Sequence, residues 1–170
     1  FICSVSSFRL RACLFFLIKN KDTLLFLFTL FHNFRYYLRG FRQAVIEAYD
    51  YQCSFCGLKL SSPDSLAWEV EAAHIVPNML RGKDDIWNGL ALCRTHHWAF
   101  DVGWITLSHR FIVRISSQVE KLPAKFGKME STDLIRMFKN GKTRIRLPVD
   151  QNLFPHESAL NWHRTNRFVL

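Results

Sequence analysis

The sequence predicts a single α+β domain, and three observations lead to this fold class. Apolar side chains recur at helical spacing over residues 38–50, the centre of the chain has the pattern strand, loop, strand, helix, and a β-hairpin and a terminal helix follow. A chain of 170 residues has room for one modest hydrophobic core with extensions rather than for two full domains. Its 49% apolar and 22% charged residues are typical of a globular protein and exclude a disordered chain.

The first predicted element is the amphipathic helix over residues 38–50, which carries Phe41, Val45, Ile46 and Tyr49 on one face. Residues of this kind at this spacing pack on a neighbouring layer. We therefore expect the helix to cover the core that follows it.

The central elements are short. A strand is predicted over residues 68–76, a polar loop over 78–85, a second strand over 90–92 and a helix over 94–102. Proline at position 77 ends the first strand, because proline cannot donate a ladder hydrogen bond. The core therefore consists of two strands and a helix.

The C-terminal part is predicted to be rich in β-structure. Residues 104–107 and 111–115 flank a turn and favour a hairpin, residues 144–147 favour a further strand, and residues 157–167 favour a terminal helix. We divide the chain into a leader of unassigned status (1–36), which need not belong to the native protein, a core domain (37–116) and a basic C-terminal extension (117–170).

The charge of the chain favours a polyanionic partner. Lys and Arg number 23 against 14 Asp and Glu, which gives a net charge of +9 and a pI near 9.6. Residues 121–146 alone hold eight Lys or Arg against two acidic residues. Nucleic acid is the first candidate and an anionic membrane surface the second. Because the apolar runs of residues 1–36 fall short of the roughly 20 residues of a membrane-spanning helix, we expect no membrane span.

Two ligand pairs predict a structural metal site. Cys53-x2-Cys56 is followed by Cys93-x2-His96, and three thiolates with one imidazole form a common tetrahedral zinc site. Such a site adds folding free energy to a core with little apolar surface. Three alternatives remain open: ordinary buried cysteines, a redox dithiol, and the neighbouring His97 in place of His96. Five cysteines with one tight pair indicate a reducing compartment, and we expect a cytoplasmic protein.

A second constellation surrounds these pairs. The segment EAAHIVP at 71–77 is followed by Asn88 and then by the helix RTHHWAFD at 94–101. This stretch resembles the HNH endonuclease family, which implies a ββα-metal (His-Me finger) core. The segments FRQAV at 41–45 and WHR at 162–164 resemble the group of HNH restriction endonucleases more closely.

The resemblance implies a role for each site residue. By position, His74 matches the general base, Asn88 the middle Asn, and His97 the metal-binding His. Such nucleases need a divalent cation, Mg²⁺ or another, and an activated water. Asp101 lies one helical turn after His97, so it is a second candidate ligand, although it could instead cap the helix or form a salt bridge.

One position departs from the family pattern. Many members carry an acidic metal ligand directly before the general base, and here that residue is Ala73. Strand alternation places Glu71 on the face opposite His74, so we expect Glu71 to reach the site only through a bulge. The metal shell would then consist of His97, Asp101, water and substrate phosphate.

The expected function is hydrolysis of phosphodiester bonds in double-stranded DNA by a restriction-like endonuclease, with a homodimer as a candidate assembly. The competing hypothesis is a zinc-braced DNA-binding module without catalysis, which the alanine at position 73 favours. A third hypothesis is a peripheral membrane protein that uses residues 1–33.

Overall fold

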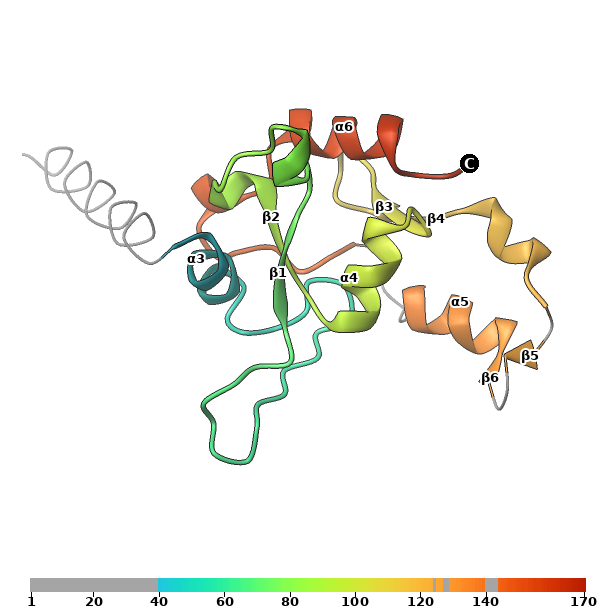
Figure 1. The fold of residues 1–170 in the computed structure, drawn as a ribbon, viewed down its shortest axis with the longest axis horizontal. Coiled ribbons are helices and arrows are strands. Elements are labelled where there is room, and N and C mark those ends of the chain that lie inside the picture. Colours follow the sequence, from blue (N-terminus) through green and yellow to red (C-terminus); the bar gives the residue numbers. More distant parts are fainter. Residues whose placement is uncertain (1–39, 124, 127–128, 140–143) are drawn as a thin grey trace, which may run out of the picture. The chain divides into compact units, whose positions relative to one another are not determined.

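Two antiparallel strands followed by a helix form the centre of the fold (Figure 1). Strand β1 (Glu71–His74) pairs with β2 (Gly89–Leu92), and helix α4 (Arg94–Asp101) begins two residues after β2 ends. The register runs from Glu71 opposite Leu92 to His74 opposite Gly89 without a bulge. All four residues of β2 are buried, because this strand lies between α3 and the remainder of the core. The predicted α+β fold class with its ββα unit is confirmed.

The structure is a computed structural model that describes residues 40–123, 125–126, 129–139 and 144–170. Within it Arg39–Leu170 forms one compact unit. The predicted leader 1–36 lies outside the described residues, and the three-part division of the chain stays a prediction. Among the described helices, none is both long and apolar enough to cross a membrane.

Helix α3 (Gly40–Ala48) covers the two strands as its apolar face predicts. Val45 is fully buried, and the approach is so close at Gly89 that an added Cβ there would lie 2.4 Å from Val45 Cγ2 and 3.0 Å from the Phe41 ring. A side chain at position 89 would therefore push α3 away from β2.

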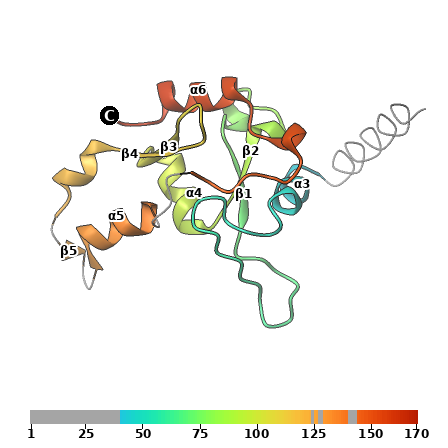
Figure 2. The ribbon, with the colours of Figure 1, turned by 180° about the vertical axis from the view of Figure 1, so that it is seen from behind.

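The predicted hairpin is present as β3 (Ile105–Leu107) and β4 (Val113–Ile115), and the terminal helix as α6 (Glu157–Asn166), which packs against β3. Residues 125–139, for which no element was predicted, form the strand pair β5 (Lys125–Phe126) and β6 (Met129–Glu130) and helix α5 (Ser131–Lys139). The segment before α6 passes in front of β1 and β2 in Figure 2, and there Arg146 N donates to Ser54 O and His156 N donates to Trp87 O.

Three predicted boundaries are wrong. The strand expected over 68–76 is regular only over β1, because the Asn88 side chain replaces the ladder at Val76. The expected loop 78–85 begins with a 3-10 helix, Asn78–Leu80. The strand expected over 144–147 is a single bridge between Arg144 and Ile112.

Candidate active site and metal centre

The four predicted zinc ligands meet at one point. Sulfur or nitrogen atoms of Cys53, Cys56, Cys93 and His96 all lie within 4.8 Å of one another. Cys53 and Cys56 come from the turn before β1, while Cys93 precedes α4 and His96 lies in its first turn. The turn is closed by Gly57 in a left-handed conformation, φ +75°, whose N–H donates to Cys53 O.

The spacing of these atoms fits a tetrahedral zinc ion. Cys56 Sγ lies 3.9 Å from Cys93 Sγ, and Cys53 Sγ lies 3.7 Å from His96 Nδ1. Zinc–sulfur bonds of about 2.3 Å at tetrahedral angles would separate two sulfur ligands by roughly 3.8 Å. The Cys93 Sγ to His96 Nδ1 distance of 3.0 Å is shorter and would open slightly around the ion. These residues could therefore hold zinc.

His96 rather than His97 completes this group. Its ring is buried, its Nδ1 faces the cysteines, and its Nε2 lies 3.1 Å from Met137 O in α5. A neutral ring that donates from Nε2 to that carbonyl leaves the Nδ1 lone pair for a metal, which is the usual support of a metal-bound histidine. The alternative with His97 as the fourth ligand is thus excluded by the position of that side chain, described below.

The thiols influence one another before any metal binds. Hydrogen bonds from Cys56 and Cys93 lower the pKa of Cys53, whereas the contact with Cys53 raises the pKa of Cys93. Without a metal, the cluster therefore favours a single thiolate and disfavours deprotonation of a second cysteine, because like charges repel at these distances. A divalent cation removes that repulsion.

His74 ends β1 and is the first residue of the candidate active site. Its ring stacks on Phe41 of α3, with ring centres 3.9 Å apart and planes at 14°. Its Nε2 lies 2.8 Å from Asp84 Oδ1, and Asn78 Nδ2 donates to the same oxygen at 3.2 Å. A carboxylate at Nε2 favours the tautomer protonated there and leaves the Nδ1 lone pair as the basic nitrogen.

Asn88 holds the connection between β1 and β2 in shape. Its buried amide accepts from Val76 N and donates to the carbonyls of Val76 and Lys83, each at 2.9 Å. These bonds fix the backbone at Val76, two residues after His74, and at Lys83, directly before Asp84. Asn88 therefore positions the loop that carries the partner of His74.

His97 and Asp101 lie on one face of α4, as their spacing predicts. His97 Nε2 is 3.4 Å from Asp101 Oδ2. The opposite nitrogen, Nδ1, is 3.0 Å from Glu71 Oε2, and the other oxygen of Glu71 is 3.7 Å from Arg94 Nε. His97 consequently points away from the cysteine group.

The expectation for Glu71 was met in part. Glu71 lies on the strand face opposite His74, yet without a bulge in β1 its carboxylate approaches Nδ1 of His97, the ring nitrogen that faces away from Asp101. Helix α4 packs against β1 so that the two ring nitrogens of His97 approach different carboxylates, Nδ1 that of Glu71 and Nε2 that of Asp101. Strand alternation describes β1 alone and cannot predict this packing.

His74, His97 and Asp101 line one cavity of about 430 Å³. Arg167, which directly follows α6, lines the same cavity. Partial burial raises the pKa of Asp101, while the nearby charges of His97 and Arg167 oppose that rise. The cavity thus brings together the imidazoles of His74 and His97, the Asp101 carboxylate and the Arg167 guanidinium.

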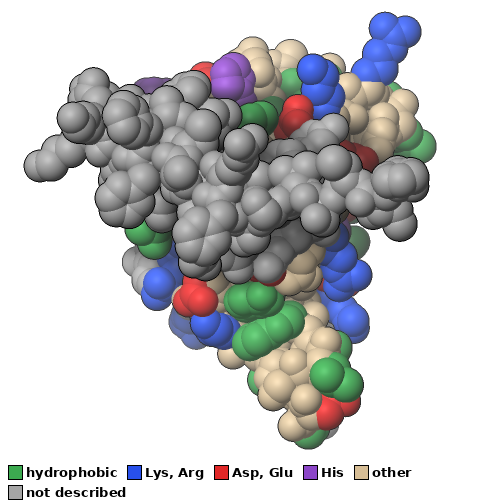
Figure 3. Space-filling view, turned by 90° about the vertical axis from the view of Figure 1, so that its left-hand side faces the viewer, with side chains coloured by type: hydrophobic (Ala, Val, Ile, Leu, Met, Phe, Trp, Pro, Cys, Tyr) green, Lys and Arg blue, Asp and Glu red, His purple; other side chains and the backbone are tan. Residues whose placement is uncertain are grey.

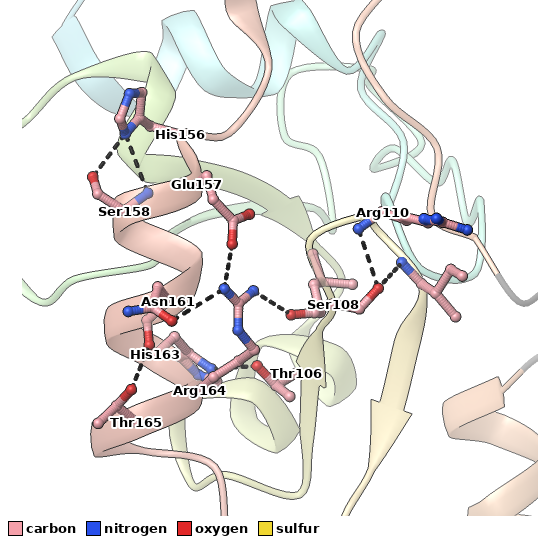
Figure 4. A network of polar contacts seen from close by, with 12 residues as sticks. Thr106, Ser108, Arg110, His156, Glu157, Ser158, Asn161, His163, Arg164 and Thr165 are labelled. Carbon is pink, nitrogen blue, oxygen red and sulfur yellow. Dashed lines mark hydrogen bonds and ion pairs between the residues drawn. The ribbon is translucent and has the colours of Figure 1, made fainter.

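The C-terminal helix reaches the cavity through a buried histidine (Figure 4). His163 stacks on Phe100 with ring centres 3.6 Å apart, its Nε2 lies 2.9 Å from Phe100 O, and its Nδ1 lies 2.8 Å from Thr106 Oγ1. Burial lowers the pKa of His163 to about 4, so the ring is neutral, donates from Nε2 and accepts at Nδ1. His163 is therefore a structural residue that joins α6 to α4 and β3.

The backbone around Arg167 is fixed by contacts on both sides of the residue. Its N–H donates to His163 O at 2.9 Å, and its carbonyl lies against Gly103, where an added Cβ would be 2.1 Å from that oxygen. Arg164 ties the same helix to the hairpin through a 2.9 Å bond to Leu107 O (Figure 4). Arg167 is thus presented to the cavity from a fixed backbone.

The sequence reasoning missed Asp84 and Arg167 as members of this site. Asp84 stands ten positions after His74 in a polar loop, and Arg167 stands in the tail. Neither shares a periodic pattern with the residues that it approaches. Only the folding of the loop brings Asp84 to His74, and only the docking of α6 brings Arg167 to the cavity.

Comparisons with known proteins agree with this geometry. Residues 53–108 match a family model described as HNH endonuclease. A search of solved structures finds a modification-dependent TagI restriction endonuclease with a TM-score of 0.51 and 20% sequence identity, which at this identity is a likeness of fold. The match covers 73% of this chain and 36% of that one, so this chain spans about a third of that protein's length. No curated protein matches the chain. Residues 53–108 thus carry the HNH endonuclease pattern, and the resemblance expected from the sequence is confirmed.

Proposed function

We propose that this protein is a metal-dependent endonuclease that hydrolyses phosphodiester bonds of double-stranded DNA in a restriction-like manner. The observation that carries the proposal is the convergence of His74, His97 and Asp101 on one cavity next to Arg167. The match of residues 53–108 to HNH endonucleases supports the same reaction class.

In this proposal His74 is the general base. Its Nδ1 takes a proton from the attacking water, and the Asp84 carboxylate at Nε2 stabilises the imidazolium that forms. Stacking on Phe41 prevents the ring from rotating away. Asn88 acts indirectly, because it holds the backbone on both sides of Asp84.

His97 and Asp101 would hold the divalent cation, Mg²⁺ or another. Their donor atoms are 3.4 Å apart, and two ligands bonded at about 2.1 Å with angles of 90–109° are separated by roughly 3.0–3.4 Å. A cation bound there supplies charge neutralisation at the phosphate and at the leaving oxygen. Glu71 keeps His97 Nδ1 protonated, which leaves Nε2 for the metal. The Cys53, Cys56, Cys93 and His96 group would hold a separate, structural zinc ion.

The basic charge of the chain supports a nucleic-acid substrate. Lys and Arg side chains gather on both sides of the face drawn in Figure 3. Contacts of this kind bind the phosphate backbone of DNA and weaken as salt increases. We place the reaction in the cytoplasm, where the thiols of the zinc group stay reduced, and we keep a homodimer as a candidate assembly.

A zinc-braced DNA-binding module without catalysis is the second candidate. It is favoured by Ala73, which is fully buried at the position where many HNH proteins carry an acidic ligand. Ala73 pairs with Leu90 in the β1–β2 ladder, and its methyl group offers no ligand atom to a metal.

The proposal is tested by incubating the purified protein with supercoiled plasmid in Mg²⁺, Mn²⁺ or Ni²⁺, and in a chelator. We expect nicked or linear products with at least one of the ions and none with the chelator. If the protein binds DNA in a salt-sensitive manner but cuts with none of the ions, the endonuclease proposal is wrong and the binding module takes its place.

Replacing Arg167 is expected to reduce cleavage without unfolding the protein. In our proposal its guanidinium contacts the substrate phosphate, and loss of one such contact in an active site costs about 10²-fold in rate. Arg167→Ala should show this loss in the plasmid assay, and Arg167→Lys should recover part of it. Arg110→Ala, on the turn between β3 and β4, is the matched control and should cleave normally. Equal rates for Arg167→Ala and Arg110→Ala would exclude the phosphate contact.

A further inference from the structure

A second cavity, of about 490 Å³, lies between the connection of β1 to β2 and the first turns of α6. Two indole rings, Trp87 and Trp162, line it together with the cationic side chains of Arg81 and Lys83. Asp85 is the one carboxylate among its lining residues. The volume is within the usual range of roughly 300–1,000 Å³ for small-ligand sites.

Trp87 is held in place although 43% of it is exposed. Its Nε1 donates to Asn152 O, and its own carbonyl accepts from His156 N at 2.9 Å. Both partners belong to the segment that leads into α6. The indole therefore offers an accessible apolar face at little entropic cost, a feature typical of binding sites.

The two cations occupy a sharply bent loop. Arg81 adopts a left-handed backbone conformation, φ +67°, which is unfavourable for a residue with a side chain. An added Cβ at the next residue, Gly82, would lie 1.8 Å from Val76 O, so the bend is packed tightly against the end of β1. Within the described part of the chain, neither Arg81 nor Lys83 forms an ion pair, and both are exposed.

This cavity and the catalytic cavity share a wall. Lys83 and Asp85 line the second cavity, whereas Asp84 between them bonds to His74 in the first. Asn88 anchors the same wall through Lys83 O. Successive nucleotides rise only about 3.4 Å along a DNA strand, so a strand cut beside His74 brings neighbouring nucleotides to this wall.

We propose that the second cavity receives one unstacked nucleotide of the strand being cut. Its base lies against Trp87 and Trp162, and its phosphate is bound by Arg81 and Lys83. The inference rests on the proposed function, because it takes nucleic acid as the substrate. It adds that the protein prefers DNA in which a base near the cut is unpaired or flipped out.

The physical reason for this occupant is the pairing of aromatic and cationic groups. A base inside a duplex is stacked on both sides and cannot present its face to an indole. An unpaired base can, and such stacking contributes about 1–3 kcal/mol per base. An apolar ligand without charge would leave Arg81 and Lys83 unused.

The test measures binding without cleavage. In the zinc-loaded His74→Ala protein, fluorescence anisotropy compares a labelled duplex that carries one bulged nucleotide with the fully paired duplex of the same sequence. We expect the bulged duplex to bind about tenfold more tightly. Trp162→Leu should abolish that preference and Trp162→Phe should keep it. Equal affinity for both duplexes, or a preference unchanged by Trp162→Leu, would overturn the inference.

A second variant covers the case in which Trp162→Leu fails to fold, as judged by its melting curve. Arg81→Gly suits the left-handed backbone at this position, so its effect reports on the side chain alone. It should weaken binding of the bulged duplex, and unaltered binding would contradict the phosphate contact. Plasmid cleavage by the unmodified chain tests the endonuclease separately: cutting without a bulge preference leaves the nuclease intact and removes this inference.

Discussion

His74→Ala is expected to reduce plasmid cleavage by about 10²- to 10⁴-fold, the range that a positioned general base contributes. His74 lines the candidate catalytic cavity and its Nε2 contacts Asp84, and in our proposal its Nδ1 is the base. Its loss removes the base and leaves the metal ligands in place. Single-turnover cleavage rates of the two proteins at saturating metal measure the effect.

The control for His74→Ala is His109→Ala, on the turn between β3 and β4, which should cleave normally. Both variants should keep the melting temperature and the zinc content of the unmodified protein. Added imidazole should restore part of the activity of His74→Ala, because removal of the His74 ring leaves a space beside Phe41 that free imidazole can fill. A rate within twofold of the unmodified protein would exclude His74 as the base.

Cys53→Ser is expected to abolish folding. Cys53 is fully buried and supplies one of the four candidate zinc ligands, and a serine hydroxyl is a poor ligand in its place. Structural zinc contributes about 10–16 kcal/mol of apparent binding free energy, comparable with the entire 5–15 kcal/mol stability of a typical domain. Far-UV circular dichroism and zinc per chain by mass spectrometry measure the loss.

Ser54→Ala is the matched control for Cys53→Ser, because Ser54 is the adjacent residue and is also fully buried. Its hydroxyl has no hydrogen-bond partner among the residues that the structure describes, so its removal should leave stability unchanged or slightly higher. A folded Cys53→Ser protein with one zinc ion per chain would show that the cysteine group does not hold the metal that supports the fold.

Local spacing explains why much of the site was predictable. Two residues separate Cys53 from Cys56 on a turn, and two residues separate Cys93 from His96 at the start of a helix, so each pair is set by local backbone geometry. His97 and Asp101 share a helical face for the same reason. Such predictions need only the period of the element.

Contacts between elements were not predictable in this way. The choice between His96 and His97 depended on the rotation of α4 relative to β1, which the hydrophobic face of the helix sets. Glu71 reached His97 because the helix crosses the strand, although alternation along β1 suggested otherwise. Helix α5 was missed, and its Met137 carbonyl contacts the candidate zinc ligand His96.

The sequence by itself predicted the order of the central elements, the four candidate zinc ligands up to one ambiguity, and His74 and His97 as candidate site residues, because these follow from periodicity, ligand spacing and family pattern. Only the tertiary structure decided which residues surround them. Asp84 contacts His74, Glu71 contacts His97, Arg167 lines the cavity that both histidines share, and two indoles line the second cavity. The physical reason is that these contacts join segments with no common period. The contacts of Arg167 and Trp162 additionally require that the C-terminal helix docks onto the ββα core, as it does through the buried His163.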